Sequence, residues 1–182
     1  MKIVGIDPGL ERTGYGVVEA DGGRYRLLAA DCLTTDERQA LPQRLQILHG
    51  QLRDRLADAR PEAVAVEELY SHYGHPRTAI LMGHARGVIC LAAAELKIPL
   101  VQYAATHIKR AVVGTGGASK AQVQGMVQRW LNLSQRPEPE DIADALAIAL
   151  THVFTLQGRA RLRLPATSRA GQAGPAVQGA AA

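Results

Sequence analysis

Four acidic residues in this sequence have the type and spacing of ligands for divalent metal ions. Asp7 and Glu67 each follow a short apolar run, and Asp141 and Asp144 are three residues apart in an apolar segment. Residues three apart lie on the same face of a helix. Carboxylate oxygens are the ligands that Mg²⁺ and Mn²⁺ prefer, and a pair of such ions can promote displacement at a phosphodiester. We therefore predict a two-metal site, and we call these residues the four candidate acids.

Two of the four candidate acids also have simpler structural explanations. Asp7 precedes a Pro-Gly turn, in which an aspartate often caps its own loop. Asp141 would be favourable at a helix N-terminus whatever its function, because of the helix dipole. Asp144 is harder to explain in this way, because it lies among alanines and leucines that must pack on other elements. An unpaired buried carboxylate there would destabilise the fold unless a cation binds it.

The glycines on both sides of Asp7 bear on the same question. Gly5 and Gly9 carry no side chain, so they would let a phosphate or a metal ion approach the backbone near Asp7. Such a site requires the fold to bring together four acids that lie far apart in the sequence.

Alternating strand and helix patterns predict an α/β fold that can do this. The predicted strands are residues 3–7, 13–20, 24–33, 63–66 and 99–103. The predicted helices are residues 40–59, 77–96, 106–113, a segment beginning after Ser119, and residues 141–154. A strand that is reached through a helical crossover lies parallel to the earlier strand, so strands 3–7 and 63–66 should end at the same edge of the sheet.

The charge distribution indicates how the chain could bind a polyanion. The 182 residues include 21 basic and 17 acidic side chains, for a formal net charge of +4. Four arginines lie in the acid-free segment 158–182, which leaves the rest of the chain neutral. We predict a folded domain over residues 1–157 and a flexible basic tail over residues 158–182. A neutral domain that binds nucleic acid must gather its basic residues on one face or bind cations that mask its acids.

The cysteines and the hydropathy pattern predict a cytoplasmic protein. Cys32 and Cys90 lack the Cys-x-x-Cys spacing of a zinc module, and they are expected to be small buried residues in a reducing compartment. No apolar run reaches the roughly 18 residues of a membrane-spanning helix. We therefore expect no association with a membrane.

Three residues outside the acids are candidates for contact with nucleic acid. Tyr70 lies in a polar and aromatic segment directly after Glu67-Glu68, where its ring could stack on a base or pack back on the sheet. Lys109 lies in the predicted helix 106–113. Lys120 follows a Ser119 cap, where a positive charge opposes the helix dipole, so a functional role competes with that of a plain solvated lysine. The preceding glycine-rich segment lacks the Gly-Lys-Ser/Thr ending of a phosphate loop.

Taken in order, several motifs resemble the RuvC family of Holliday junction resolvases. The matching motifs are Gly5–Gly9 with Thr13–Gly16, Val66–Glu68, His84–Val88, Lys109 with Val112–Gly114, Ser119–Gln124 and Asp141–Ala149. The resemblance runs from Lys2 to about Thr155. It implies a ribonuclease H-like fold with a five-stranded mixed sheet flanked by helices, and an endonuclease that resolves four-way DNA junctions by paired symmetric nicks in recombination and repair.

By position, the resemblance assigns the four candidate acids to two Mg²⁺ ions per active site, with Mn²⁺ as a substitute. It assigns Tyr70, Lys109 and Lys120 to DNA, with Tyr70 at a position where relatives often carry Phe. Glu68 stands at a position where a relative can carry Gln, and the resemblance does not explain this extra acid. It also implies a homodimer and a branch-migration helicase as a partner. The predicted helix 77–96 is apolar on more than one face, so it is either enclosed in the core or shared with a second subunit.

Three other functions compete with this interpretation. An actin-like sugar kinase also begins with an acid followed by glycines, but it needs a second such lobe, and 182 residues leave no room for one. A non-catalytic scaffold that binds junctions would be favoured by the loss of one acid, whereas all four are present. A related ribonuclease H-like nuclease that acts on RNA is excluded only by the breadth of the resemblance.

Overall fold

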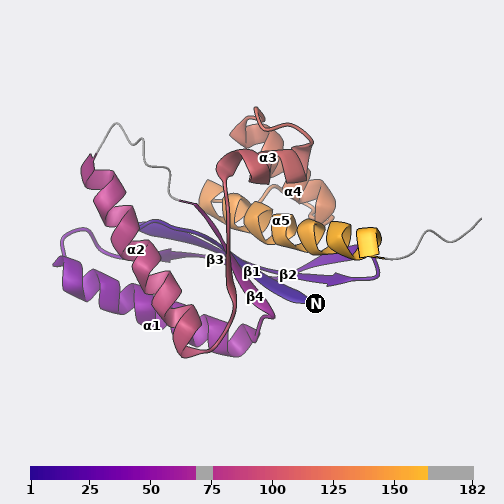
Figure 1. Cartoon of the computed structure of the whole chain (residues 1–182). Coiled ribbons are helices and arrows are strands. Elements are labelled where there is room, and N and C mark those ends of the chain that lie inside the picture. Colours follow the sequence, from indigo (N-terminus) through magenta and orange to yellow (C-terminus); the bar gives the residue numbers. More distant parts are fainter. Residues whose placement is uncertain (69–75, 164–182) are drawn as a thin grey trace, which may run out of the picture.

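The computed structural model describes residues 1–68 and 76–163, which form a five-stranded sheet with helices on both faces (Figure 1). The strands are β1 (Lys2–Asp7), β2 (Arg12–Asp21), β3 (Arg24–Thr34), β4 (Ala63–Glu67) and β5 (Leu100–Tyr103). The helices are α1 (Leu41–Ala59), α2 (Pro76–Glu95), α3 (Ala105–Val113), α4 (Lys120–Trp130) and α5 (Glu140–Arg163).

The sheet is mixed, as predicted, and β1 lies at its centre. The strand order is β3-β2-β1-β4-β5. β1 pairs antiparallel with β2 and parallel with β4, and β4 pairs parallel with β5. The hairpin between β2 and β3 turns through Gly22 and Gly23, whose φ angles of 53° and 86° suit glycine far better than other residues. The predicted parallel arrangement of the first and fourth strands is therefore confirmed.

The two faces of the sheet are covered by different sets of helices. α1 and α2 lie on one face, while α3, α4 and α5 lie on the other (Figure 1). The helix predicted over residues 40–59 is confirmed as α1, and its apolar face contributes Leu48, Leu52 and Leu56, which are fully buried against the sheet. α4 begins with the predicted Ser119 cap, which forms a capping box: the Ser119 hydroxyl accepts the Gln122 N–H, and the Gln122 side chain accepts the Ser119 N–H.

The last helix extends further than the sequence pattern indicated. We expected it to run to Phe154 and a flexible tail to begin at residue 158, but α5 continues through Gly158 to Arg163. Aromatic packing anchors this half of the helix, since Phe154 contacts Trp130 and Tyr25, and the Tyr25 hydroxyl donates to Gln157 Oε1 at 2.7 Å. A glycine lowers helix stability by about 1 kcal/mol, which such contacts can offset. Residues 164–182 lie outside the described part of the chain.

None of the helices within residues 1–68 and 76–163 combines the length and the hydropathy that a membrane-spanning segment requires.

Candidate active site

Two parallel strands bring the first pair of acids to one edge of the sheet. Asp7 is the last residue of β1, and Glu67 is the last residue of β4. Ile6 pairs with Val66 in the parallel ladder. Asp7 and Glu67 are the next residues of the two strands, so they lie at the same level of the sheet. The neighbouring positions that the sequence predicted for Asp7 and Glu67 are confirmed.

The second pair of acids is carried by α5, which lies directly on β1 and β2. A Cβ atom on Gly5 would lie 1.9 Å from the carbonyl oxygen of Ala145, and one on Gly14 would lie 2.0 Å from the carbonyl oxygen of Asp141. Real Cβ atoms do not approach other atoms this closely, so any side chain at either position would displace the helix. The two glycines allow the first turns of α5, with Asp141 and Asp144, to lie above the end of β1.

This packing corrects the interpretation of the glycines that flank Asp7. We expected Gly5 and Gly9 to leave room for a phosphate or a metal ion. Gly5 instead leaves room for the α5 backbone. A Cβ atom on Gly9 would lie 2.1 Å from the carbonyl oxygen of Arg12, so Gly9 permits the tight connection between β1 and β2. Both glycines therefore influence where Asp7 lies, because they allow segments of the backbone to pack closely on either side of it.

The four candidate acids interact electrostatically, and the effect is largest at Asp7. Burial, followed by the negative charges of Asp144, Glu67 and Asp141 in that order, raises the pKa of Asp7 to about 8. Burial is also the main cause that raises the pKa of Glu67, followed by the charge of Asp144. Burial raises the pKa of Asp144, although the Lys120 ammonium opposes this effect. The site therefore has too little positive charge for all of its carboxylates to ionise freely.

Two lysines lie beside this group of acids. Lys120 Nζ lies 3.2 Å from Glu140 Oε2 and 3.6 Å from Asp144 Oδ2. The charge of Lys109 lowers the pKa of Glu67. Both lysines line a cavity of about 190 Å³ together with Glu67 and Asp144. The structure thus brings both predicted lysines next to the candidate acids.

Sequence reasoning missed two arginines that hold this site together. Arg12, at the start of β2, donates from Nε to Asp141 Oδ2 at 2.8 Å, and its Nη2 lies 2.7 Å from the same oxygen. Arg86 of α2 donates to the carbonyl oxygen of Glu67 at the end of β4. Arg86 lies within the His84–Val88 motif of the family resemblance, but no sequence pattern connected either arginine with the acids, because each contact joins two different elements of the fold.

The donor set suits a hard divalent cation, but it is not assembled as a metal site. Within residues 1–68 and 76–163, no group of three or more His, Cys, Asp and Glu side chains is arranged to hold a metal ion. Asp141 and Asp144 are instead paired with Arg12 and Lys120. The donors are all carboxylates, and Asp7 is both buried and close to three other acids, which are the properties expected of ligands for Mg²⁺ or Mn²⁺.

Of the two other residues that the sequence singled out near Glu67, only Glu68 belongs to the described part of the chain. Tyr70, the candidate for base stacking, falls in residues 69–75, outside the described part of the chain. Glu68 is exposed, and its backbone N–H donates to the carbonyl oxygen of Tyr103 at 2.9 Å. The pairing between β4 and β5 thus continues one residue past Glu67, which fixes the backbone at this edge of the sheet.

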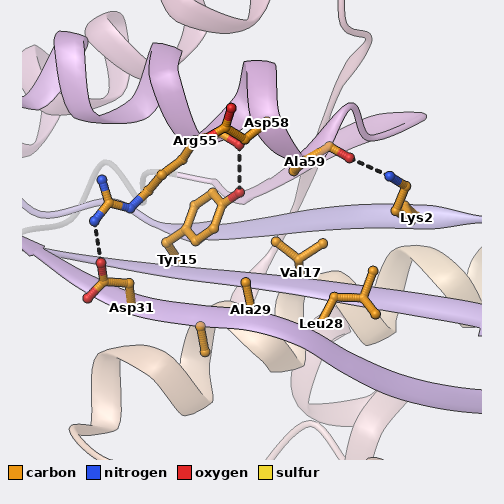
Figure 2. Close-up of a pocket in the computed structure, with 10 residues that line it drawn as sticks. Lys2, Tyr15, Val17, Leu28, Ala29, Asp31, Arg55, Asp58 and Ala59 are labelled. Atoms are coloured by element: carbon orange, nitrogen blue, oxygen red, sulfur yellow. Dashed lines mark hydrogen bonds and ion pairs between the residues drawn. The ribbon is translucent and has the colours of Figure 1, made fainter.

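A separate cavity of about 450 Å³ lies between α1 and the β2–β3 hairpin (Figure 2). None of the four candidate acids lines it. Its polar groups bond to one another: Arg55 pairs with Asp31, the Tyr15 hydroxyl donates to the carbonyl oxygen of Arg55 at 3.2 Å, and Lys2 Nζ donates to that of Ala59 at 2.6 Å. Because these interactions join α1 to the strands, we assign this cavity to the fold and not to the candidate site.

Comparison with known proteins gives consistent results over nearly the whole described chain. The family model described as Crossover junction endodeoxyribonuclease RuvC matches residues 3–152. The protein of that name from Rhodopirellula baltica is 48% identical over 148 residues, which cover 81% of this chain and 83% of the relative. The one from Bordetella avium is 44% identical over 173 residues, which cover 94% of each chain.

Solved structures agree with the sequence comparison. The structure of Thermus thermophilus RuvC in complex with a Holliday junction substrate has a TM-score of 0.83 at 38% identity, covering 87% of this chain and 96% of that one. A yeast mitochondrial Holliday junction resolvase has a TM-score of 0.62 at 15% identity, which shows a shared fold. These neighbours confirm the predicted ribonuclease H-like class.

Proposed function

The chain belongs to the RuvC family of crossover junction endodeoxyribonucleases, and we propose that it resolves four-way DNA junctions by two symmetric nicks. The observation that carries this proposal is the convergence of two strand ends and one helix start. At this point the negative charges of Glu67, Asp141 and Asp144 all act on Asp7. A nuclease that hydrolyses phosphodiesters with metal ions needs this kind of carboxylate group.

We propose that the four candidate acids hold two Mg²⁺ ions, for which Mn²⁺ can substitute. Bound divalent ions would activate water and stabilise the charge on the attacking and leaving oxygens. The all-oxygen donor set and the charge deficit at Asp7 support this assignment. Burial of Asp7 and Asp144 limits their hydration, so a cation would interact with them more strongly than with exposed acids.

The neighbouring residues position the acids and attract DNA. Arg86 and the backbone N–H of Glu68 fix the end of β4, and thereby the Glu67 side chain. We propose that Lys109 and Lys120, which line the cavity beside Glu67 and Asp144, attract the DNA phosphates. We also propose that Tyr70 stacks on a base near the junction, as the family resemblance implies.

We propose that the protein acts as a homodimer through the outer face of α2. Ile80 and Leu91 are 61% and 52% exposed, an unusual exposure for large apolar side chains. A Cβ atom added to Gly83 or Gly87 would meet no atom within 4 Å, so a second helix can approach closely there. A two-fold axis through this face would place two sites on a symmetric junction.

Sedimentation of matched variants tests the dimer. The unmodified chain and Leu28→Asp, which changes an exposed leucine on β3, should sediment as dimers. Leu91→Asp should sediment as a monomer. A monomeric unmodified chain at micromolar concentration, or a dimeric Leu91→Asp variant, would contradict the use of α2.

We propose the cytoplasm as the site of action, and a branch-migration helicase as a partner. Cys32 and Cys90 are half-buried and do not form a disulfide with each other, which suits a reducing compartment. The family resemblance alone supports the second.

A substrate comparison tests the function itself. Purified protein is incubated with a four-way DNA junction, a linear DNA duplex and an RNA–DNA hybrid, each with Mg²⁺ or with a chelator. We expect paired nicks in the junction, only with Mg²⁺. Binding without cleavage would favour a non-catalytic scaffold, and preferred cleavage of the hybrid would favour a nuclease that acts on RNA.

A further inference from the structure

Arg12 occupies an unusual place, between a candidate metal ligand and an open cavity. Its guanidinium makes two contacts, of 2.8 and 2.7 Å, with the same oxygen of Asp141. The Cys32 Sγ lies 3.9 Å from that oxygen. The Arg12 side chain is nevertheless 46% exposed, and it lines a cavity of about 640 Å³ that begins at Asp7. It can therefore leave Asp141 without unfolding its surroundings.

A metal ion and Arg12 would compete for Asp141. A carboxylate oxygen that already accepts a hydrogen bond from a guanidinium and forms an ion pair with it has much of its charge neutralised. Binding of a divalent cation to the same oxygen must weaken or replace this pair. Because the pair is partly exposed, the competition should be modest, of the size measured for surface ion pairs.

The cavity beside Arg12 has the wrong charge for DNA as long as that pair exists. Four acids and two arginines line it, and one of the arginines is Arg12, which is neutralised by Asp141. The other, Arg44, donates from Nε to Thr35 Oγ1 at 2.9 Å and is held in place. A cation on Asp141 would neutralise this acid and release Arg12, and a cation on Asp7 would add positive charge beside it. Only then would the cavity attract a phosphate.

We propose that Arg12 is a positioning residue that holds Asp141 until a metal ion binds, and that it then contacts a DNA phosphate in this cavity. This inference rests on the proposed metal site. It adds an order of events, in which the ion at Asp141 prepares the surface for the DNA backbone. Guanidinium suits both partners, because its planar fork pairs with carboxylate and with phosphate.

Metal titration in the absence of DNA tests the first half. The affinity for Mn²⁺ is measured by isothermal titration calorimetry on the unmodified chain, Arg12→Gln and Arg26→Gln. Arg26 pairs with Glu19 at the other end of β2 and serves as the control. Arg12→Gln should bind Mn²⁺ roughly two- to fivefold more tightly than the unmodified chain, whereas Arg26→Gln should be unchanged. Equal or weaker binding by Arg12→Gln would overturn the competition.

The outcome also separates this inference from the proposed function. If the unmodified chain binds no Mn²⁺, the metal site itself fails. If it binds Mn²⁺ with the same affinity as Arg12→Gln, only the role of Arg12 fails. Circular dichroism and thermal unfolding of each variant exclude misfolding as the cause, and Arg12→Lys, which keeps the charge but not the fork, should bind Mn²⁺ with intermediate affinity.

Salt dependence of junction binding tests the second half. The slope of log K against log salt is measured in chelator and in Ca²⁺, which also takes oxygen ligands. In Ca²⁺, Arg12→Gln should reduce the magnitude of the slope by about one, the amount expected for one lost phosphate contact. In chelator, where Asp141 neutralises Arg12, the slope should not change. If Arg12→Gln has the same slope as the unmodified chain in both solutions, or a slope reduced equally in both, Arg12 does not exchange Asp141 for a phosphate when the metal ion binds.

Discussion

Gly14 and Asp141 are in direct backbone contact, because a Cβ atom on Gly14 would lie 2.0 Å from the carbonyl oxygen of Asp141. Gly14 is also the cross-strand partner of Asp7 in the β1–β2 ladder. The missing side chain at Gly14 is therefore what lets the first turn of α5 lie over the end of β1. Gly14, a residue without a side chain, thus determines how close the candidate acids come to one another.

We expect Gly14→Ala to affect both stability and cleavage. The added methyl group must push α5 outwards, and overpacking of this kind lowers the free energy of unfolding by about 1 to 3 kcal/mol. A shift of about 1 Å in catalytic groups can reduce a rate about 100-fold. Urea unfolding and junction cleavage measure the two effects.

Gly50→Ala is the matched control, since Gly50 lies in α1 and a Cβ atom there would meet nothing within 4 Å. This variant should be as stable as the unmodified chain, or more stable by up to about 1 kcal/mol. Full activity of Gly14→Ala would show that the acids do not depend on the position of α5.

Asp7→Asn should stabilise the metal-free protein at pH 8. Burial and the neighbouring carboxylates raise the pKa of Asp7 from 3.8 to about 8 in the fold, so between these values the unfolded chain releases a proton that the folded chain retains. Stability therefore falls as pH rises, by at most about 1.4 kcal/mol per pH unit from this group. Asparagine cannot ionise, so the Asp7→Asn variant does not lose stability in this way as the pH rises.

Urea unfolding in chelator at pH 5 and pH 8 measures the effect of Asp7→Asn. The gain in stability should be larger at pH 8 than at pH 5. A variant that is less stable than the unmodified chain at pH 8 would show that Asp7 forms stabilising interactions that outweigh its burial.

Lys120→Gln should weaken junction binding and reduce its salt dependence. Lys120 lies at the start of α4 beside Asp144, within the cavity that also holds Glu67. Loss of one phosphate contact lowers the magnitude of the salt slope by about one. The control is Lys97→Gln, at an exposed position between α2 and β5, for which no change of slope is expected. Equal slopes for both variants would return Lys120 to the class of solvated lysines.

Tyr15→Phe should make stability less sensitive to alkaline pH. Burial raises the pKa of the Tyr15 hydroxyl from 10.0 to about 12, so between these values the unfolded chain loses a proton that the folded chain keeps. This group therefore reduces stability as pH rises above 10. Urea unfolding at pH 9 and pH 11 should show a smaller loss of stability for Tyr15→Phe than for the unmodified chain. An equal loss in both proteins would contradict burial of this hydroxyl.

The sequence was most informative where a local pattern determines position. Apolar runs located β1 and β4, and the crossover rule placed Asp7 and Glu67 at one edge of the sheet, as the structure shows. The spacing of Asp141 and Asp144 located both on α5. Such predictions succeed because strand ends and helix faces follow from the periodicity of a single segment.

The sequence was least informative where two distant segments touch. The pairing of Arg12 with Asp141 joins residues 129 positions apart, and no local pattern encodes it. The contact between Gly5 and α5 was missed for the same reason, and the glycine was attributed to ligand access. The end of α5 was placed too early because Gly158 looked like a boundary, whereas the helix continues to Arg163 and the Tyr25 hydroxyl donates to Gln157 directly before the glycine.

The central claim is that the four candidate acids form a metal-dependent site that cleaves four-way junctions. The most direct test measures the cleavage rate of Asp7→Asn with Mg²⁺ and, on the same preparation, its affinity for the junction. The matched control is Glu62→Gln, an exposed acid at the opposite end of β4. We expect Asp7→Asn to lose cleavage by at least about 100-fold while it binds the junction as tightly as the unmodified chain, or more tightly. Cleavage by Asp7→Asn at the rate of Glu62→Gln would contradict the claim.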